Sequence, residues 1–298
     1  MELGAVSAPE FVLFLPQMRF GIDDIVERAV AAESSGFRGI SFMDHLAPPL
    51  AESSPMYEAI TLATWVAART TDLIVSHLVL CDAFRHPAVL ARQAVTLDHA
   101  SLGRFELGLG SGSVPDELLT FGVTTDGTGA RITRLADTLE LLEAWWTGET
   151  VDRPDGRTPV VGARQLPTPL GRIPITIGGS GPRTLELVRR HADWWNLPVH
   201  QLDRLDDLRP HVGDARVSTQ HLVAFVPDAA VRDEVAATAT RRFGGLGSGL
   251  VIGEAGELVE HFGTLRTRGI ERFHIWFADF AAPSTREAFG AGVIAALG

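Results

Sequence analysis

The sequence predicts a single (β/α)8 TIM barrel over residues 1–298, with loop insertions at the carboxyl-terminal face of the strands. Three observations predict this fold. The chain has 298 residues, close to the roughly 250 that one such barrel needs. Eight short apolar runs alternate with helical patterns, and no linker divides them. In the stretch 84–112 a helix leads directly into a strand and a glycine loop, which is half of a βαβ unit.

The first half of the chain contributes four predicted strands. Pro87 fits the first turn of a helix, where a missing N–H costs nothing, and Gly103 ends that helix. After it, apolar Phe105, Leu107 and Leu109 alternate with other residues, as in a strand. By the same patterns we expect strands at 11–16, 37–43, 72–80 and from 105, and helices at 22–36, 56–69 and 87–100.

The second half repeats the alternation around two loops. Residues 113–130 are predicted to be a polar loop that precedes a long helix ending at Trp146. Residues 152–172 contain four prolines, and a loop of that length is usually functional or mobile. Strands are expected at 174–177, 192–196, 217–226 and 272–277, with helices after Pro182, at 229–242, at 254–268 and at the end of the chain.

Composition excludes several classes of function. The formal charge is −11, with the acidic residues spread along the chain, so a nucleic-acid partner is not expected. All 26 basic residues are arginine, which excludes a P-loop NTPase of the usual kind and Schiff-base chemistry on lysine. The lone Cys81 excludes an internal disulfide and is compatible with a reducing compartment. We expect a cytoplasmic protein without a membrane partner, because no signal-peptide or membrane-spanning pattern is present.

Residues at the carboxyl ends of the predicted strands are expected to be functional, because ligands bind such barrels at that rim, whereas residues at the amino ends are expected to serve stability. Arg104 falls on the opposite rim, so we expect it to be a structural ion-pair partner. The residues placed on the functional rim are Gln17, Asp44, His45, Cys81, Asp82, Ser111, Ser180, Asn196 and Asp279.

The loop Gly178-Gly179-Ser180-Gly181-Pro182 is the clearest candidate binding motif. Its glycines expose backbone N–H groups, Ser180 adds a hydroxyl, and the following helix presents its positive dipole end. The loop therefore suits an anion such as phosphate, with a tight turn and helix cap as the alternative. The other glycine cluster, at 108–112, does not match the dinucleotide fingerprint, because its third glycine falls one position early.

Asp44 and His45 are the candidate catalytic residues. A histidine at a strand end can transfer a proton near neutral pH, and a neighbouring carboxylate can fix its orientation. The alternative is a surface or packing histidine. We expect no catalytic metal, because the ten histidines form no H-x-H or H-E-x-x-H pattern. Cys81 either lines the pocket or is buried and inert.

Taken together, these residues resemble the bacterial luciferase-like family of flavin- and deazaflavin-dependent oxidoreductases. The likeness covers nearly the whole chain, in four blocks that keep the order seen in the family. The blocks are GFRGISFMDHL at 36–46, FRHPAVLARQAVTLDHASLGRFELGLGSG at 84–112, ARITRLADTLELLEAWWTGE at 130–149 and IGGSGPRTLELVRRHADWWN at 177–196.

The resemblance implies a noncovalent cofactor across the mouth of the barrel, with its phosphate at the loop 178–182. It implies a non-proline cis peptide in strand three, between His77 and Val79, so that Leu78 and Val79 contact the cofactor ring. It also implies that His45 acts in proton transfer or substrate orientation. Some sugar-phosphate dehydrogenases of the family have a glutamate where this chain has Ser111. The lysines that bind substrate phosphate in those relatives cannot exist here.

The lead hypothesis is an oxidoreductase that uses the 5-deazaflavin coenzyme F-420 (F420) for hydride transfer to or from a small organic substrate. FMN is the alternative cofactor, in a monooxygenase that uses reduced flavin and oxygen. A barrel hydrolase and a non-catalytic flavin-binding barrel are the other hypotheses. F420 is favoured because its lactyl-oligoglutamate tail would leave an open phosphate end, where Arg183 follows the loop. We also expect a homodimer.

Overall fold

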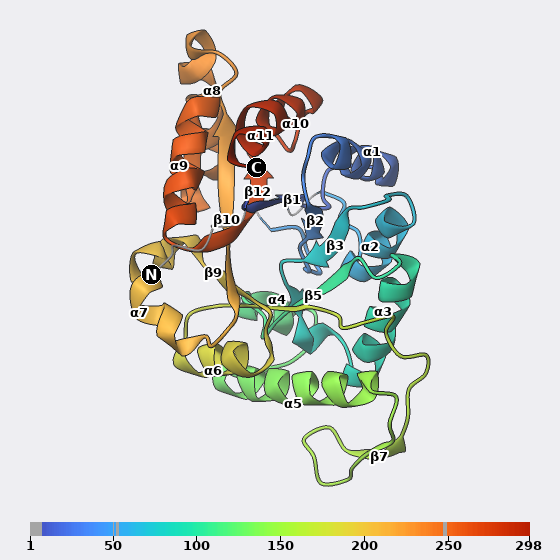
Figure 1. The fold of residues 1–298 in the computed structure, drawn as a ribbon. Coiled ribbons are helices and arrows are strands. Elements are labelled where there is room, and N and C mark those ends of the chain that lie inside the picture. The colour runs from blue at the N-terminus through green and yellow to red at the C-terminus, as the bar shows by residue number, and fades with distance from the viewer. Residues whose placement is uncertain (1–7, 50, 52–53, 247–248) are drawn as a thin grey trace, which may run out of the picture.

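The computed structural model describes residues 8–49, 51, 54–246 and 249–298, and in them eight parallel strands close into a barrel (Figure 1). The strands pair in chain order, and the last one returns to the first. This arrangement confirms the predicted fold class. The barrel strands are β1 (Glu10–Phe14), β2 (Gly39–Phe42), β3 (Ile74–His77), β5 (Phe105–Gly110), β8 (Ile175–Gly178), β9 (Trp194–Leu197), β10 (Arg216–Phe225) and β12 (Ile270–Phe277).

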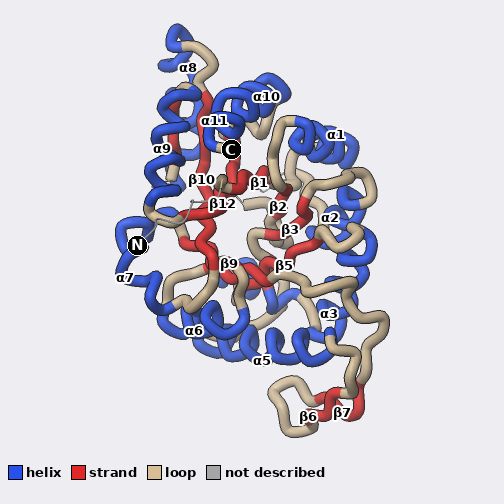
Figure 2. Tube along the Cα trace, in the orientation of Figure 1, coloured by secondary structure: helices blue, strands red, loops and turns tan. Residues whose placement is uncertain are grey.

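Helices surround this ring of strands (Figure 2). Helix α3 shows why the helices begin where they do. Pro87 is its first residue, and the side chain of His86, just before the helix, accepts a hydrogen bond from the Ala88 N–H. Beyond the end of α3, Gly103 takes φ +81°, which favours glycine. The helices are α1 (Ile22–Ser34), α2 (Ala59–Ala67), α3 (Pro87–Ala100), α5 (Thr128–Trp146), α6 (Pro182–His191), α7 (Leu205–Leu208), α8 (Arg232–Phe243), α9 (Ala255–Thr267), α10 (Pro283–Phe289) and α11 (Ala295–Leu297).

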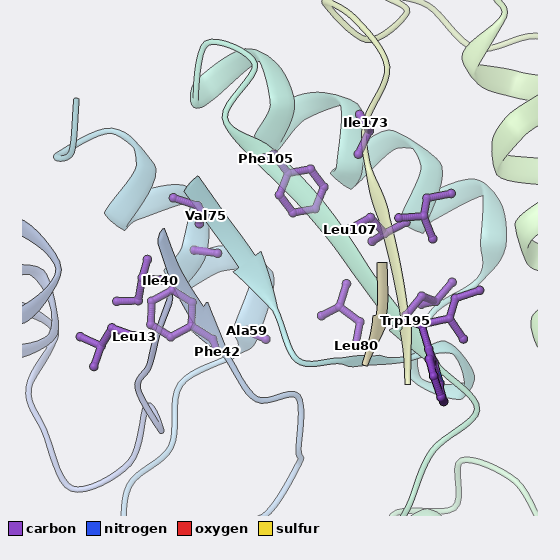
Figure 3. Close-up of a cluster of buried hydrophobic side chains, with 14 of the residues drawn as sticks. Leu13, Ile40, Phe42, Ala59, Val75, Leu80, Phe105, Leu107, Ile173 and Trp195 are labelled. Carbon is purple, nitrogen blue, oxygen red and sulfur yellow. The ribbon is translucent and has the colours of Figure 1, made fainter. Parts of the chain in front are cut away.

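The hydrophobic core fills the layer between strands and helices. Ile40 and Phe42 on β2 and Val75 on β3 are completely buried there, beside Ala59 of α2 (Figure 3). Strands that are covered on both faces read as nearly continuous apolar runs. This is why the strands could be recognised in the sequence.

An ion-pair network fills the amino-terminal end of the barrel interior. Arg272 on β12 forms two hydrogen bonds with Glu106 on β5, and it pairs with Glu10 on β1. Strands β12 and β5 are not neighbours in the sheet, so the Arg272–Glu106 pair crosses the interior. The guanidinium also lies 3.8 Å from the ring centroid of Trp194. Burial lowers the pKa of Arg272, but the two carboxylates outweigh it, and the pKa is raised.

Several elements differ from the sequence prediction. Helix α4 (Pro115–Thr120) lies within the stretch predicted to be a polar loop. Strands β6 (Val151–Arg153) and β7 (Val160–Ala163) form an antiparallel hairpin at the start of the proline-rich segment. Strand β11 (Leu250–Gly253), which pairs with β10 outside the barrel, was not predicted. The predicted third strand is divided into β3 and β4 (Leu80–Cys81).

Arg104 is a structural residue, but the expectation of an ion pair was wrong. Its guanidinium donates to the backbone carbonyls of Ala67, Thr70 and Leu73, at 2.6–3.0 Å. These carbonyls lie at the end of α2 and before β3. Arg104 therefore ties that connection to the start of β5.

In the described ranges, no helix is long and apolar enough to span a lipid bilayer.

The network predicts the effect of removing its cation. Arg272→Leu leaves the buried carboxylate of Glu106 without its partner, so the free energy of unfolding should fall by about 3–5 kcal/mol in urea denaturation. Arg216→Leu is the matched control, because Arg216 also stacks on Trp194 and pairs with Glu10 and Glu271 but is exposed. This substitution should lower the free energy of unfolding by less than about 1 kcal/mol. Equal losses for the two variants would contradict the assignment.

Candidate functional site

A cavity of about 360 Å³ opens at the carboxyl-terminal end of the barrel strands. Residues on the barrel strands, or on the segments directly after them, line most of it. The lining residues are Asp44, His45, Leu78, Val79, Leu80, Cys81, Gly110, Ser111, Gly112, Ser113, Val114, Glu117, Leu118, Gly178, Gly179, Asn196, Pro198 and Gln220. The lining confirms the position predicted for Asp44, His45, Cys81, Ser111 and Asn196.

The Leu78–Val79 peptide bond is cis and lies between β3 and β4, at the place the resemblance implied. Two glycines of β5 make room for this bulge. A Cβ atom on Gly108 would collide with the carbonyl oxygen of His77, and one on Gly110 would lie 2.8 Å from Val79 Cγ2. The bulge places Leu78 and Val79 in the cavity wall.

Asp44 is held by an arginine that sequence reasoning did not select. Arg85 Nη1 donates to Asp44 Oδ2 at 2.6 Å, and Nη2 donates to Oδ1 at 2.9 Å. The Cys81 N–H adds a third bond to the same carboxylate, at 2.8 Å. Arg85 also pairs with Glu58, the residue that caps α2. Asp44 is therefore anchored to α2 and to the loop before α3.

His45 has a different partner from the predicted one. Its Nδ1 lies 2.9 Å from Oε2 of Glu117, on α4. The other oxygen of Glu117 accepts the N–H groups of Leu46 and Ala47, at 2.7 and 3.0 Å. The expectation that Asp44 orients His45 was therefore wrong. A carboxylate only accepts hydrogen bonds, so Nδ1 is the donor, and in the neutral imidazole Nε2 then keeps its lone pair.

Glu117 was missed because α4 was missed. The helix start is nevertheless visible in the sequence: Pro115 occupies the first turn, and Asp116 and Glu117 follow it near the positive end of the dipole. A six-residue helix carries too little periodicity to be recognised by its apolar pattern.

Residues of the glycine loop line two different cavities. Gly178 and Gly179 line the barrel cavity, whereas Ser180 and Pro182 line a second cavity. Gly179 takes φ +126°, and its N–H donates to the Asn196 carbonyl. The sequence-based view that this amide is a free phosphate donor was therefore wrong. The amides of Ser180 and Gly181 have no acceptor in the part of the chain described here.

Other residues predicted on the rim form structural contacts and do not line the barrel cavity. The Gln17 amide bonds to the backbone of Met43, Asp82 pairs with Arg134, and Asp279 accepts from the first turn of α10. Burial raises the pKa of the Cys81 thiol to about 11. Cys81 therefore lines the cavity as an un-ionised thiol.

The cavity combines three chemical surfaces. Leu78, Val79 and Leu80 form an apolar wall, and His45 offers a proton acceptor at one end. The amide side chains of Asn196 and Gln220 line another part. This arrangement suits a flat polar heterocycle bound next to a reacting group that gains or loses a proton.

Comparison with protein families gives a match over residues 1–243 to the model described as luciferase-like monooxygenase. Among curated proteins, the chain is 31% identical over 176 residues to an F420-dependent glucose-6-phosphate dehydrogenase from Microbacterium testaceum. That alignment covers 59% of this chain and 52% of the relative. The match thus spans about half the length of the curated relative.

Solved structures share the fold over almost the whole chain. An F420-dependent secondary alcohol dehydrogenase in complex with an F420-acetone adduct superposes with a TM-score of 0.83 at 17% identity, covering 98% of this chain and 100% of the other. The oxygenating constituent of 3,6-diketocamphane monooxygenase from Pseudomonas putida, in complex with FMN, gives 0.75 at 19% identity, covering 97% and 99%. At these identities the likeness shows the fold alone.

The contacts of Glu117 predict which nitrogen of His45 carries the proton. In Glu117→Gln the amide oxygen can still accept from Leu46 and Ala47, which turns the NH₂ group toward Nδ1. The ring should then switch to the Nε2–H tautomer, as measured by long-range ¹H–¹⁵N correlation spectra. Glu143→Gln, beside His191, is the control and should leave the His45 signals unchanged. An Nδ1–H tautomer that persists in Glu117→Gln would contradict this geometry.

Proposed function

The chain belongs to the luciferase-like monooxygenase family, and from that premise we propose that it is an F420-dependent oxidoreductase. It transfers hydride to or from a small organic substrate. One observation carries the proposal: a single cavity at the barrel mouth connects His45, the apolar wall at Leu78–Val79 and the glycine loop.

The residues present fit such a cofactor. The apolar wall of Leu78, Val79 and Leu80 offers a surface on which a face of the tricyclic ring would lie. Asn196 Oδ1 accepts from Ser218, which leaves its NH₂ group free for a ring carbonyl. The amides of Ser180 and Gly181 would hold the phosphate. Bound F420 supplies a carbon centre that accepts or releases hydride.

F420 is preferred to FMN on two grounds. The curated relative at 31% identity is named as F420-dependent. In addition, the loop that would hold the phosphate also borders a second cavity, so a cofactor that continues beyond its phosphate has somewhere to go. Arg183 does not contribute to that cavity, because it donates to Gly129 and Thr133 at the start of α5.

His45 is proposed to move the proton that accompanies hydride transfer. With Nδ1 committed to Glu117, its Nε2 can take a proton from a substrate hydroxyl or return it to a carbonyl. Asp44 is proposed to position this end of the cavity through Arg85 and the Cys81 N–H. General acid–base help of this kind contributes roughly 10²–10⁴-fold in rate.

We propose an uncharged alcohol or carbonyl compound as the substrate. Glu117 lines the cavity beside His45, and its charge disfavours an anion there, whereas the charge of Asp44 is balanced by Arg85. A cytoplasmic location is also proposed, in keeping with the reduced, buried Cys81.

A homodimer is proposed through the groove where α2 faces α3. Its volume is about 710 Å³, and its walls include Ile22, Tyr57, Ile60 and Trp65. Trp65 is 47% exposed there, with Arg69 stacked on its ring. An apolar patch of this kind is typical of a protein interface.

The cofactor proposal predicts the outcome of parallel titrations. F420 and FMN should be added separately to the protein, with binding followed by fluorescence and oxygen consumption recorded with candidate alcohols. We expect tight F420 binding and no substrate-dependent oxygen uptake. Tight FMN binding with oxygen uptake, and no measurable binding of F420, would replace the proposal by an FMN monooxygenase of the same family.

The dimer proposal predicts a mass of twice 32.1 kDa in light scattering. Trp65→Glu should shift the protein to the monomer, because it buries a charge in the apolar groove. Val161→Glu is the control, since Val161 is exposed on β7 and is not part of the groove lining. A parent protein that is monomeric at micromolar concentration would overturn the proposal.

A further inference from the structure

Besides the barrel cavity, the glycine loop borders a second cavity. Its volume is about 490 Å³. Its lining residues come from helix α6 with the loop before it, and from the segment η2 (Val199–Arg204), α7 and η3 (Arg209–His211). The lining residues are Ser180, Pro182, Leu185, Glu186, Arg189, Arg204, Asp207, Leu208, Pro210 and His211.

The two cavities meet at one loop. Gly179 lines the barrel cavity and Ser180, the next residue, lines the second one. Consecutive Cα atoms are only about 3.8 Å apart. A phosphodiester on the amides of Ser180 and Gly181 would therefore have one substituent in each cavity.

The charges of the second cavity include one cation that is available to a ligand. Arg189 is bound to Glu186 by two hydrogen bonds, at 3.0 and 2.6 Å. Arg204 donates to the Gln201 side chain at 2.8 Å, and no carboxylate lies within ion-pair distance of it in the described ranges. His211 adds a donor, and Asp207 is the one lining carboxylate besides Glu186 among the described residues. The positive charge open to a ligand thus lies on Arg204.

We propose that this second cavity, the tail cavity, binds the oligoglutamate tail of F420, with Arg204 as a partner of a tail carboxylate. The inference rests on the proposed function and extends it to a second subsite. FMN ends at its phosphate and would leave the tail cavity empty. The cavity therefore provides recognition that distinguishes the two cofactors, on residues remote from the reacting end.

The test compares two forms of the cofactor: F420 with several glutamates, and the same cofactor without any glutamate. Affinities are measured by fluorescence titration, which requires no turnover. The parent protein should bind the tailed form more tightly. Arg204→Glu replaces an attraction by a repulsion, so affinity for the tailed form should fall about tenfold. Affinity for the tail-less form should stay within about twofold, and the loss should shrink at high salt.

Two further variants control the experiment. Arg190→Glu changes a charge on the same helix, but Arg190 pairs with Glu140 and lines neither cavity; it should affect neither form. Gly179→Val should weaken both forms alike, because φ +126° excludes a branched residue and its Cβ would lie 3.1 Å from Thr184 Cγ2.

The outcomes separate the two proposals. Equal losses of both cofactor forms in Arg204→Glu, or equal affinity of the parent for both forms, would overturn the tail cavity and leave the F420 function in place. Failure of the parent to bind either form while it binds FMN would overturn the proposed function itself.

Discussion

The Arg272–Glu106 pair across the barrel interior is the constraint on which the location of the site depends. A closed eight-stranded barrel must fill its interior with side chains, and here a buried ion pair occupies the amino-terminal end. Glu10 and the face of Trp194 complete the surroundings of the guanidinium. With that end occupied, ligand-sized space inside the barrel is left at the carboxyl-terminal end, beside Gly110 and Gly178.

The fold could be predicted from the sequence because burial on both faces makes barrel strands nearly continuous apolar runs. The rim could be predicted too, since parallel strands end on one side and bring distant residues together. Partners could not. Asp44 and His45 are adjacent in the chain and line the same cavity. Each nevertheless pairs with a residue from elsewhere, Arg85 or Glu117, whose choice depends on packing.

The missed elements share a physical cause. Helix α4 and strand β11 have six and four residues, too few for a period to stand out. The hairpin of β6 and β7 lies among prolines and glycines, and its cross-strand pairing is a non-local property that composition does not show. The missed helix α4 matters for the candidate site, because it carries Glu117, which forms hydrogen bonds with His45 and with the backbone of Leu46 and Ala47.

In the proposed function, the loop 178–182 would connect cofactor binding to cofactor choice. The Trp195 indole donates to the Gly179 carbonyl at 2.7 Å, while the Gly179 N–H donates to Asn196. Both polar groups of Gly179 are thus used to fix the loop against β9, which leaves the next two amides for an anion. Because those amides lie where two cavities meet, the same loop would hold a phosphate and direct the tail attached to that phosphate toward Arg204. A chain without lysine can in this way bind an anionic cofactor through backbone amides and a single arginine.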